Sequence, residues 1–307
     1  MSIPSLAPRR TVLAGLLATP LLGCDDRPKP PPPRIDLPAT PVGSLEWAAA
    51  GPWRIDRARD AWRHPVETLK FFGIRPDMNV LEVLPGRGWY TAILAPFLAK
   101  GGGRLKVASF DPATATPAQT LALEGFAKRF LSDPGTYGAI EVSAIGPTID
   151  DLAPEGSVDL ALVMRNVHTF MAEGYVERAF RAIHRALKPG GVLGIEEHRA
   201  RSTGLQDPRA GDGYVQEAFV RAVALEAGFE FAGSSEINAN PKDSKDHPFG
   251  VWTLPPVLRT APLGMPENPA FDSSPYAAIG ESDRMTLKFV KPGQAGPATV
   301  GAQKSPR

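Results

Sequence analysis

Between residues 79 and 196, short apolar segments of strand length alternate with segments of helical pattern. Such alternation is typical of a sheet of parallel strands covered by helices. The segment 158–164 is almost continuously apolar, as expected of a strand buried on both faces. The sequence therefore predicts an α/β fold with a doubly wound, mostly parallel sheet. The expected strands are 79–84, 105–110, 140–144, 158–164 and 192–196, and the helices between them are 90–98, 118–131 and 175–187.

Further elements are expected on both sides of this alternating region. Two helices, 45–61 and 65–72, precede it. A helix at 214–227 follows it, and two closing strands are expected at 229–237 and 285–290. Between those strands, residues 238–283 hold eight prolines and little periodicity. Because this segment is too long for an ordinary loop, we interpret it as an insertion and a candidate lid.

The N-terminus has the pattern of a signal peptide. Arg9 and Arg10 precede an apolar run of twelve residues, 11–22. This run is shorter than the roughly 20 residues that a membrane-spanning helix needs, but it suits a signal peptide. The run ends in Leu-Leu-Gly-Cys24, which resembles a bacterial lipobox and implies lipid attachment at Cys24. The alternative is a buried cysteine in a short helix. The arginine pair leaves general secretion and twin-arginine export both open.

We divide the chain into a signal peptide (1–24), a proline-rich linker (25–43), a folded domain (44–292) and a disordered tail (293–307). Residues 27–42 contain seven prolines, which favour an extended spacer. We therefore expect an exported protein. A lipid attached at Cys24 would anchor it to the bacterial cell membrane, where it would face the periplasm or the exterior. The 34 basic and 33 acidic residues give a net charge of +1, which argues against a broad nucleic-acid surface.

The segment 80–91 most resembles a ligand site. A strand carrying Glu82 runs into a turn with Gly86 and Gly88, and a helix begins near Tyr90. Glycines let a ligand approach the backbone, and the helix N-terminus adds free amides. Asp111 ends the next strand, 23 residues after Gly88, where a carboxylate can bind a ribose hydroxyl pair. Together these features predict a nucleoside ligand at the carboxyl edge of the sheet.

With a third motif, Leu187-Lys188-Pro189-Gly190-Gly191, the order of these segments resembles class I S-adenosylmethionine-dependent methyltransferases. More narrowly, 85–91 resembles a bacterial group of predicted methyltransferases. The resemblance implies a seven-stranded sheet with an antiparallel last strand and S-adenosylmethionine as cofactor. The implied cofactor-binding residues are Glu82, Gly86, Gly88, Tyr90, Asp111, Asp150 and Asn166, with the methionine part at the glycine turn, the ribose at Asp111 and the adenine near Asp150.

Two histidines follow later strands at the edge where this family faces its substrate. His168 comes after the strand 158–164, and His198 comes after the strand 192–196. A histidine titrates near neutral pH, so either can act as a general base; the alternative for each is a structural histidine. We expect no metal, because no tight ligand spacing is present. The expected methyl acceptor is a small molecule or lipid-like compound.

Two other functions remain as alternatives. Leu84 stands two positions after Glu82, where the family usually has glycine, so the site can be degenerate. The chain would then be a membrane-tethered module that has lost cofactor binding. A nicotinamide-dependent oxidoreductase is less consistent with the sequence, because the pattern from Gly86 to Thr91 lacks that fingerprint's third glycine.

Overall fold

The fold is built on a single seven-stranded sheet in the order β3-β2-β1-β4-β5-β7-β6. The computed structural model describes residues 40–293. Strands β1 to β5 are parallel, and β7 runs antiparallel to both of its neighbours. The prediction of a mostly parallel α/β sheet with an antiparallel last strand is therefore confirmed. The strands are β1 (Asn79–Val83), β2 (Arg104–Phe110), β3 (Ile140–Ile145), β4 (Val158–Met164), β5 (Leu187–His198), β6 (Glu230–Ser235) and β7 (Arg284–Val290).

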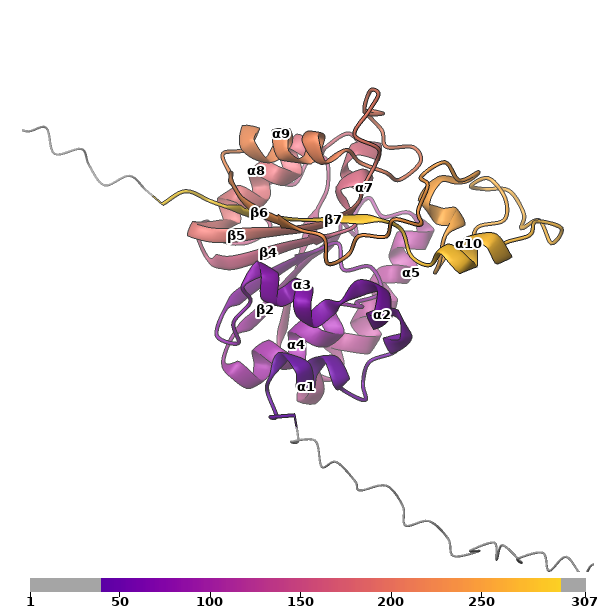
Figure 1. The fold of residues 1–307 in the computed structure, drawn as a ribbon. Coiled ribbons are helices and arrows are strands. Elements are labelled where there is room, and N and C mark those ends of the chain that lie inside the picture. The colour runs from indigo at the N-terminus through magenta and orange to yellow at the C-terminus, as the bar shows by residue number, and fades with distance from the viewer. Residues whose placement is uncertain (1–39, 294–307) are drawn as a thin grey trace, which may run out of the picture. The chain divides into compact units, whose positions relative to one another are not determined.

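Helices cover both faces of the sheet (Figure 1). One apolar core lies under α7, α8 and α9, and a second lies under α1, α3 and α4. Successive residues of β1 face opposite cores: Val80 joins the second and Leu81 the first. The helices are α1 (Leu45–Ala50), α2 (Asp60–Arg63), α3 (Pro65–Phe72), α4 (Thr91–Gly101), α5 (Pro117–Phe126), α6 (Pro134–Tyr137), α7 (Val167–Ala172), α8 (Val176–Ala186), α9 (Glu217–Glu226) and α10 (Ser274–Ile279).

The predicted helix 45–61 is wrong in its second half. The chain leaves α1 at Gly51, next to Pro52, and reforms only in a 3-10 turn (Arg57–Arg59) before α2. Tertiary contacts hold the intervening segment. Trp53 donates its indole N–H to the carbonyl of Ala92 at 2.8 Å, and Arg54 pairs with Asp60 at 2.7 Å. The break matters for function because it brings Arg59 and Arg63 to the carboxyl edge of the sheet.

Smaller differences concern element ends. The fifth strand begins at Leu187 rather than residue 192, because Lys291 pairs with Gly190 and Gly191. The helix expected at 118–131 ends in a π-helical turn (Ala127–Leu131), and the helix expected at 214–227 begins at Glu217. The helix α7 was not predicted. Its six residues are too few for a helical period to emerge from the sequence.

The segment 238–283 does lie between the last two strands of the sheet, β6 and β7, as predicted. It contains a 3-10 turn (Gly250–Thr253) and the short helix α10. Figure 1 shows this segment, with α10, extending on the right of the view beyond the ends of the strands. Buried polar side chains hold it in place: Asp243 accepts from the Tyr214 hydroxyl at 3.0 Å and pairs with His247 at 2.8 Å.

Candidate functional site

A pocket of about 340 Å³ lies where the parallel strands β1, β4 and β5 end. One wall is the glycine turn after β1, and a second is the segment from Arg165 to His168 after β4. Residues 251–257 of the insertion form a third wall, and Arg59 and Arg63 close the remaining side. Ligands bind at this edge in open α/β sheets. The structure brings Gly86 of the turn, His168 and His198 together at this pocket.

The two glycines of the turn have different roles. Gly86 has φ +56°, is exposed, and would have no atom within 4 Å of an added Cβ. Gly88 has φ +73°, but an added Cβ would lie 2.2 Å from the Phe130 ring. Gly88 is therefore needed for packing and is buried away from the ligand side. Only the surroundings of Gly86 form an open cradle for a bound group.

Leu84 adopts the left-handed conformation that glycine would take at this position, with φ +47°. Its amide donates to the carbonyl of Ala108 at 2.8 Å, which holds the strained turn in place. The side chain is 5% exposed and belongs to the core under α7 and α8. Leucine therefore preserves the backbone path of the turn while most of its side chain fills the core.

Glu82 is buried behind the turn and does not line the pocket. Its Oε2 accepts from the Thr91 hydroxyl at 2.6 Å, so it joins the end of β1 to the start of α4. Burial raises the pKa of Glu82 to about 7, although hydrogen bonds from Thr91 and the charge of Arg165 act in the opposite direction. In this structure Glu82 positions the glycine turn indirectly, because its hydrogen bond to Thr91 fixes the start of α4, the helix that follows the turn.

We expect Glu82 to make stability depend on pH. Its pKa of about 7 in the folded chain compares with an ordinary value of 4.5. The folded state therefore keeps a proton that the unfolded state releases between these pH values. The contribution of Glu82 is fully present below pH 4.5 and is lost as the pH rises through 7, a fall of about 3 kcal/mol in unfolding free energy.

The measurement is urea denaturation of the wild type and of Glu82→Gln at pH 5 and at pH 8. The glutamine variant should lose this part of the pH dependence, whereas the exposed control Glu124→Gln should keep it. The same pH dependence in wild type and Glu82→Gln would contradict the assignment.

The carboxyl ends of β1 and β4 are clamped together by Asn166. Its Nδ2 donates to the carbonyls of Val83, Leu84 and Met164 at 3.1, 3.0 and 3.2 Å. Arg165 just before it has φ +61°, and its amide donates to the carbonyl of Glu196 at 2.6 Å. Asn166 lines the pocket, but its amide nitrogen is used by the two strand ends. Only its Oδ1 is left to accept from a ligand.

Tyr90 belongs to a buried ion-pair network. Its hydroxyl donates to Glu196 Oε2 at 3.3 Å. The same carboxylate accepts from Arg165 Nη1 at 2.8 Å, and Arg284 Nε lies 2.8 Å from Oε1 without the alignment of a hydrogen bond. Burial, followed by the charge of Glu196, raises the pKa of Tyr90 well above its ordinary value, so the hydroxyl stays protonated. Tyr90 is therefore a buried support of the edge.

Asp111 and Asp150 do not line this pocket. Asp111 follows β2 at the same edge, and its carboxylate accepts from the Ala113 amide at 3.0 Å and the Thr114 hydroxyl at 3.3 Å. A carboxylate has further lone pairs, so Asp111 can still accept from a ribose. Asp150 is exposed and pairs with Arg178 at 2.9 Å, and its backbone carbonyl accepts from Arg185. The structure thus places Asp150 in a surface ion pair.

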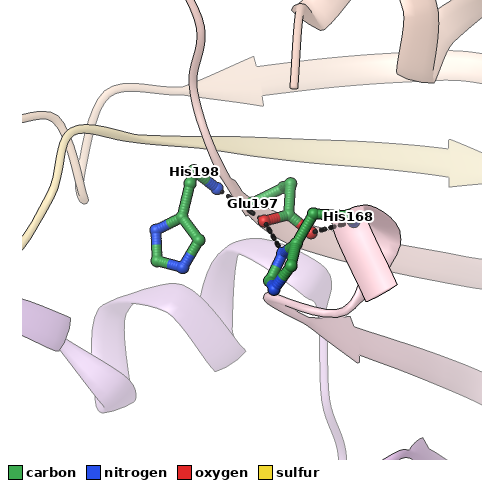
Figure 2. Close-up of side chains that lie close together, drawn as sticks. All are labelled: His168, Glu197 and His198. Carbon is green, nitrogen blue, oxygen red and sulfur yellow. Dashed lines mark hydrogen bonds and ion pairs between the residues drawn. The ribbon is translucent and has the colours of Figure 1, made fainter. Parts of the chain in front are cut away.

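His168, Glu197 and His198 form the cluster in Figure 2. Glu197 is fully buried, and its Oε1 lies 2.9 Å from His168 Nδ1. It also accepts from the amides of Val167 and His198 at 2.6 and 2.8 Å. Since a carboxylate only accepts, Nδ1 of His168 donates, and the Nε2 of the neutral ring carries the free lone pair. His168 lines the pocket, so the pair has the arrangement of an oriented general base.

His198 is held differently. Its Nδ1 lies 2.6 Å from Ser282 Oγ, and its ring centroid lies 5.4 Å from that of His168. Figure 2 shows its ring turned away from Glu197. Burial, with the charges of His168, Arg165 and Arg284, lowers the pKa of His198 well below its ordinary value. His198 is therefore a neutral imidazole at pH 7.

The side chains of this cluster offer ligand atoms within 4.8 Å of one another, close enough to hold a metal ion. Two observations favour the base over a metal. Glu197 already accepts from the His168 ring and from two backbone amides. Arg165 and Arg284 place positive charge close to His198, which opposes a dication. The expectation of no metal stays a prediction.

Glu197 and the arginine side of the pocket were missed by sequence reasoning. Glu197 stands next to His198 in the sequence and could have been named as a candidate. However, neighbouring residues of a strand such as Glu196 and Glu197 point to opposite faces, and the sequence does not show which side chain each of them contacts. Arg59 and Arg63 contact Glu281, more than 200 residues away in the chain. No local sequence pattern predicts a contact between residues so far apart in the chain.

The turn fits the methionine part of S-adenosylmethionine. Within residues 40–293, the backbone amides of Gly86 and Arg87 donate to no acceptor, and the space above Gly86 is open. A carboxylate group in the cradle can accept from these two amides. Asp111 lies along the same edge for the ribose.

Comparisons with known proteins agree with this fold. Residues 81–195 match the family described as methyltransferase domain. The [4+2]-cyclase SpnF is 17% identical over 81% of this chain and 92% of its own, with a TM-score of 0.54. A S-adenosylmethionine-dependent methyltransferase from Aquifex aeolicus is 19% identical over 60% of this chain and 88% of its own, with a TM-score of 0.47. No curated protein matches the chain. Residues 81–195 are thus similar to a methyltransferase domain, and the sheet has the Rossmann-like methyltransferase fold.

Proposed function

We propose that the protein is an S-adenosylmethionine-dependent methyltransferase that uses His168 as the general base on its acceptor. The observation that carries this proposal is the His168–Glu197 pair in a pocket that shares a wall with the open glycine turn. A non-catalytic scaffold has no need for an oriented imidazole in a pocket. When bound, S-adenosylmethionine supplies an activated methyl group, whose bond to sulfur breaks with the electron pair remaining on sulfur.

The residues of this chain bind the cofactor, bind the acceptor and take up its proton. The amides of Gly86 and Arg87 hold the methionine part, and Asp111 accepts from the ribose. His168 Nε2 takes the proton of an acceptor hydroxyl as the oxygen gains its methyl group. Glu197 holds the ring in the required tautomer and stabilises the imidazolium that forms. Residues 251–257 limit the access of water to the pocket. Neutral His198 is available as a hydrogen-bond partner for the acceptor.

Calorimetric titration of the full chain with S-adenosylhomocysteine tests the cofactor site. We expect a dissociation constant in the micromolar range for the wild type. It should rise at least about tenfold in Asp111→Ala and in Gly86→Val, because each loses roughly one charged or backbone contact. Asp77→Ala is the matched control, since Asp77 is an exposed acid that pairs with Arg75. No binding by folded wild-type protein would contradict the proposal and leave the non-catalytic module.

We further infer that the chain is exported and lipid-anchored at Cys24. This inference rests on the arginine pair, the apolar run and the terminal Leu-Leu-Gly-Cys24, all outside the described residues. Among residues 40–293, no helix has both the length and the apolar character needed to cross a bilayer. Mass spectrometry of the protein from bacterial membranes should find an acylated Cys24 at the mature N-terminus, and an intact, unmodified Met1 would contradict this inference.

A further inference from the structure

Arginines that line the pocket, together with Arg284 buried behind it, outnumber the carboxylates that pair with them. Arg59 and Arg63 share Glu281, at 2.7 and 2.8 Å, and Arg165 shares Glu196 with Arg284. Four guanidinium groups thus depend on two carboxylates. Glu197, the third carboxylate, is occupied by His168 and backbone amides. Arg87 adds a further positive charge to the pocket wall. Positive charge without an internal partner is costly to bury, and an anionic ligand offsets that cost.

Arg63 is positioned to donate into the pocket. The residue is 5% exposed, and its Nε donates to Glu281 Oε2 at 2.8 Å. Its guanidinium carbon lies 4.9 Å from the ring centre of Trp89, which fixes the plane of the group. Within the described residues, neither Nη group of Arg63 has a hydrogen-bond partner, and Arg63 lines the pocket. A fixed guanidinium edge with two free donors matches a carboxylate.

Arg165 has free donors on another wall of the same pocket. Its Nη1 binds Glu196, whereas its Nε and Nη2 donate to no group in residues 40–293. Its side chain is 14% exposed, and it precedes His168 by three residues. Burial is the main cause that lowers the pKa of His198, and the nearby His168, Arg165 and Arg284 lower it further. The arginines and the base therefore face one volume.

Another part of the pocket lining is apolar. Trp252, Leu254, Pro255 and Val257 of the insertion line it. The Trp252 ring lies 6.1 Å from the ring of His168, and Arg259 stacks on it at 4.8 Å. A ligand that fills the pocket thus contacts both guanidinium groups and an aromatic and aliphatic surface. A compact pocket of this volume suits a small molecule.

We infer that the methyl acceptor is a small amphipathic carboxylate, whose carboxylate group binds Arg63 and Arg165 and whose apolar body packs against residues 251–257. This inference rests on the proposed methyltransferase function and specifies its substrate class. The hydroxyl to be methylated then lies at the His168 end of the acceptor. The class includes hydroxylated aromatic acids and hydroxylated medium-chain fatty acids.

The test is calorimetric titration of the full chain, saturated with S-adenosylhomocysteine, with a panel of aromatic and medium-chain hydroxy acids. Each acid is paired with its own methyl ester, which keeps the body and removes the charge. We expect at least one acid to bind roughly tenfold or more tightly than its ester, because hydrogen bonds to charged groups are strong. Arg63→Gln should abolish the preference, Arg63→Lys should keep part of it, and Arg57→Gln, an exposed neighbour, should leave it unchanged.

Other outcomes separate this inference from the proposed function. Equal binding of acids and esters, with S-adenosylhomocysteine still bound, overturns the carboxylate inference alone. Tighter binding of phosphate monoesters than of any acid also overturns it. If Arg63→Gln weakens S-adenosylhomocysteine as much as it weakens the acid, the arginine serves the cofactor's carboxylate and the inference fails. If the acids bind but S-adenosylhomocysteine does not, the carboxylate site stands and the methyltransferase proposal fails.

Discussion

Replacing His168 by glutamine is expected to lower kcat by a factor of roughly 10² to 10⁴, the usual contribution of a positioned base. Glutamine retains a polar side chain of similar size but cannot take a proton at neutral pH. The Glu197 carboxylate would lose the ring that it orients. The measurement is steady-state kinetics at saturating cofactor, with the acid of the panel that turns over fastest. The dissociation constant of S-adenosylhomocysteine should change little, because His168 lies on the acceptor side.

Two further variants distinguish the base from a structural histidine. His184→Gln is the matched control and should leave kcat unchanged. His184 lies on the outer helix α8, away from the pocket, and its ring packs against that of Phe229. Glu197→Gln should lower kcat less than His168→Gln does and should move the pH profile of kcat, as expected of a residue that positions the base. A kcat within a factor of two of wild type in His168→Gln would refute the role of this residue.

Replacing Arg284 by methionine is expected to reduce the unfolding free energy by about 3–5 kcal/mol, the effect of breaking a buried ion pair. Arg284 is 1% exposed and lies between two carboxylates, with Glu281 Oε2 at 2.7 Å and Glu196 Oε1 at 2.8 Å. It also donates to the carbonyl of Trp62. Without it, two buried carboxylates lose a shared cation. The melting temperature should fall by about 10 °C.

Urea denaturation followed by circular dichroism measures this effect. Lys70→Met provides the comparison, because Lys70 pairs with Glu46 at the surface, where side chains are 60% and 46% exposed. That variant should lose far less stability, because a surface ion pair contributes little. Arg284→Lys keeps the charge but has a single donor group, so its stability should fall between wild type and Arg284→Met. Equal stability of Arg284→Met and Lys70→Met would show that the network does not hold this edge together.

Local sequence signals predicted most of the sheet. Strands 79–84, 105–110, 140–144 and 158–164 agree with β1 to β4 within one residue at each end. Those signals are strong because buried parallel strands are continuously apolar and are bounded by glycine and proline. The helix 45–61 failed because its pattern is apolar on both sides of Gly51, and only the contact of Trp53 with Ala92, 39 residues away, shows where the chain turns.

The same distinction applies to the site. The sequence alone predicted that His168 and His198 share an edge with the glycine turn. This prediction follows because the carboxyl ends of neighbouring parallel strands meet at one edge of a sheet. The sequence also placed Gly88 and Glu82 at the turn, but the structure assigns them to packing against Phe130 and to a hydrogen bond with Thr91. Which face of a turn a residue presents depends on the neighbouring layer.

The sequence by itself therefore determined the alternation of strands and helices, the edge at which we propose that a ligand binds and the residue types of the glycine turn. These properties follow from periodicity and backbone preference, which act over a few residues. Only the tertiary structure decided that Glu281 joins Arg59 and Arg63, that Glu197 orients His168, and that residues 251–257 form the apolar wall. Charged and apolar partners separated by tens to hundreds of residues leave no periodic signal, because their pairing depends on how the packed layers bring them together.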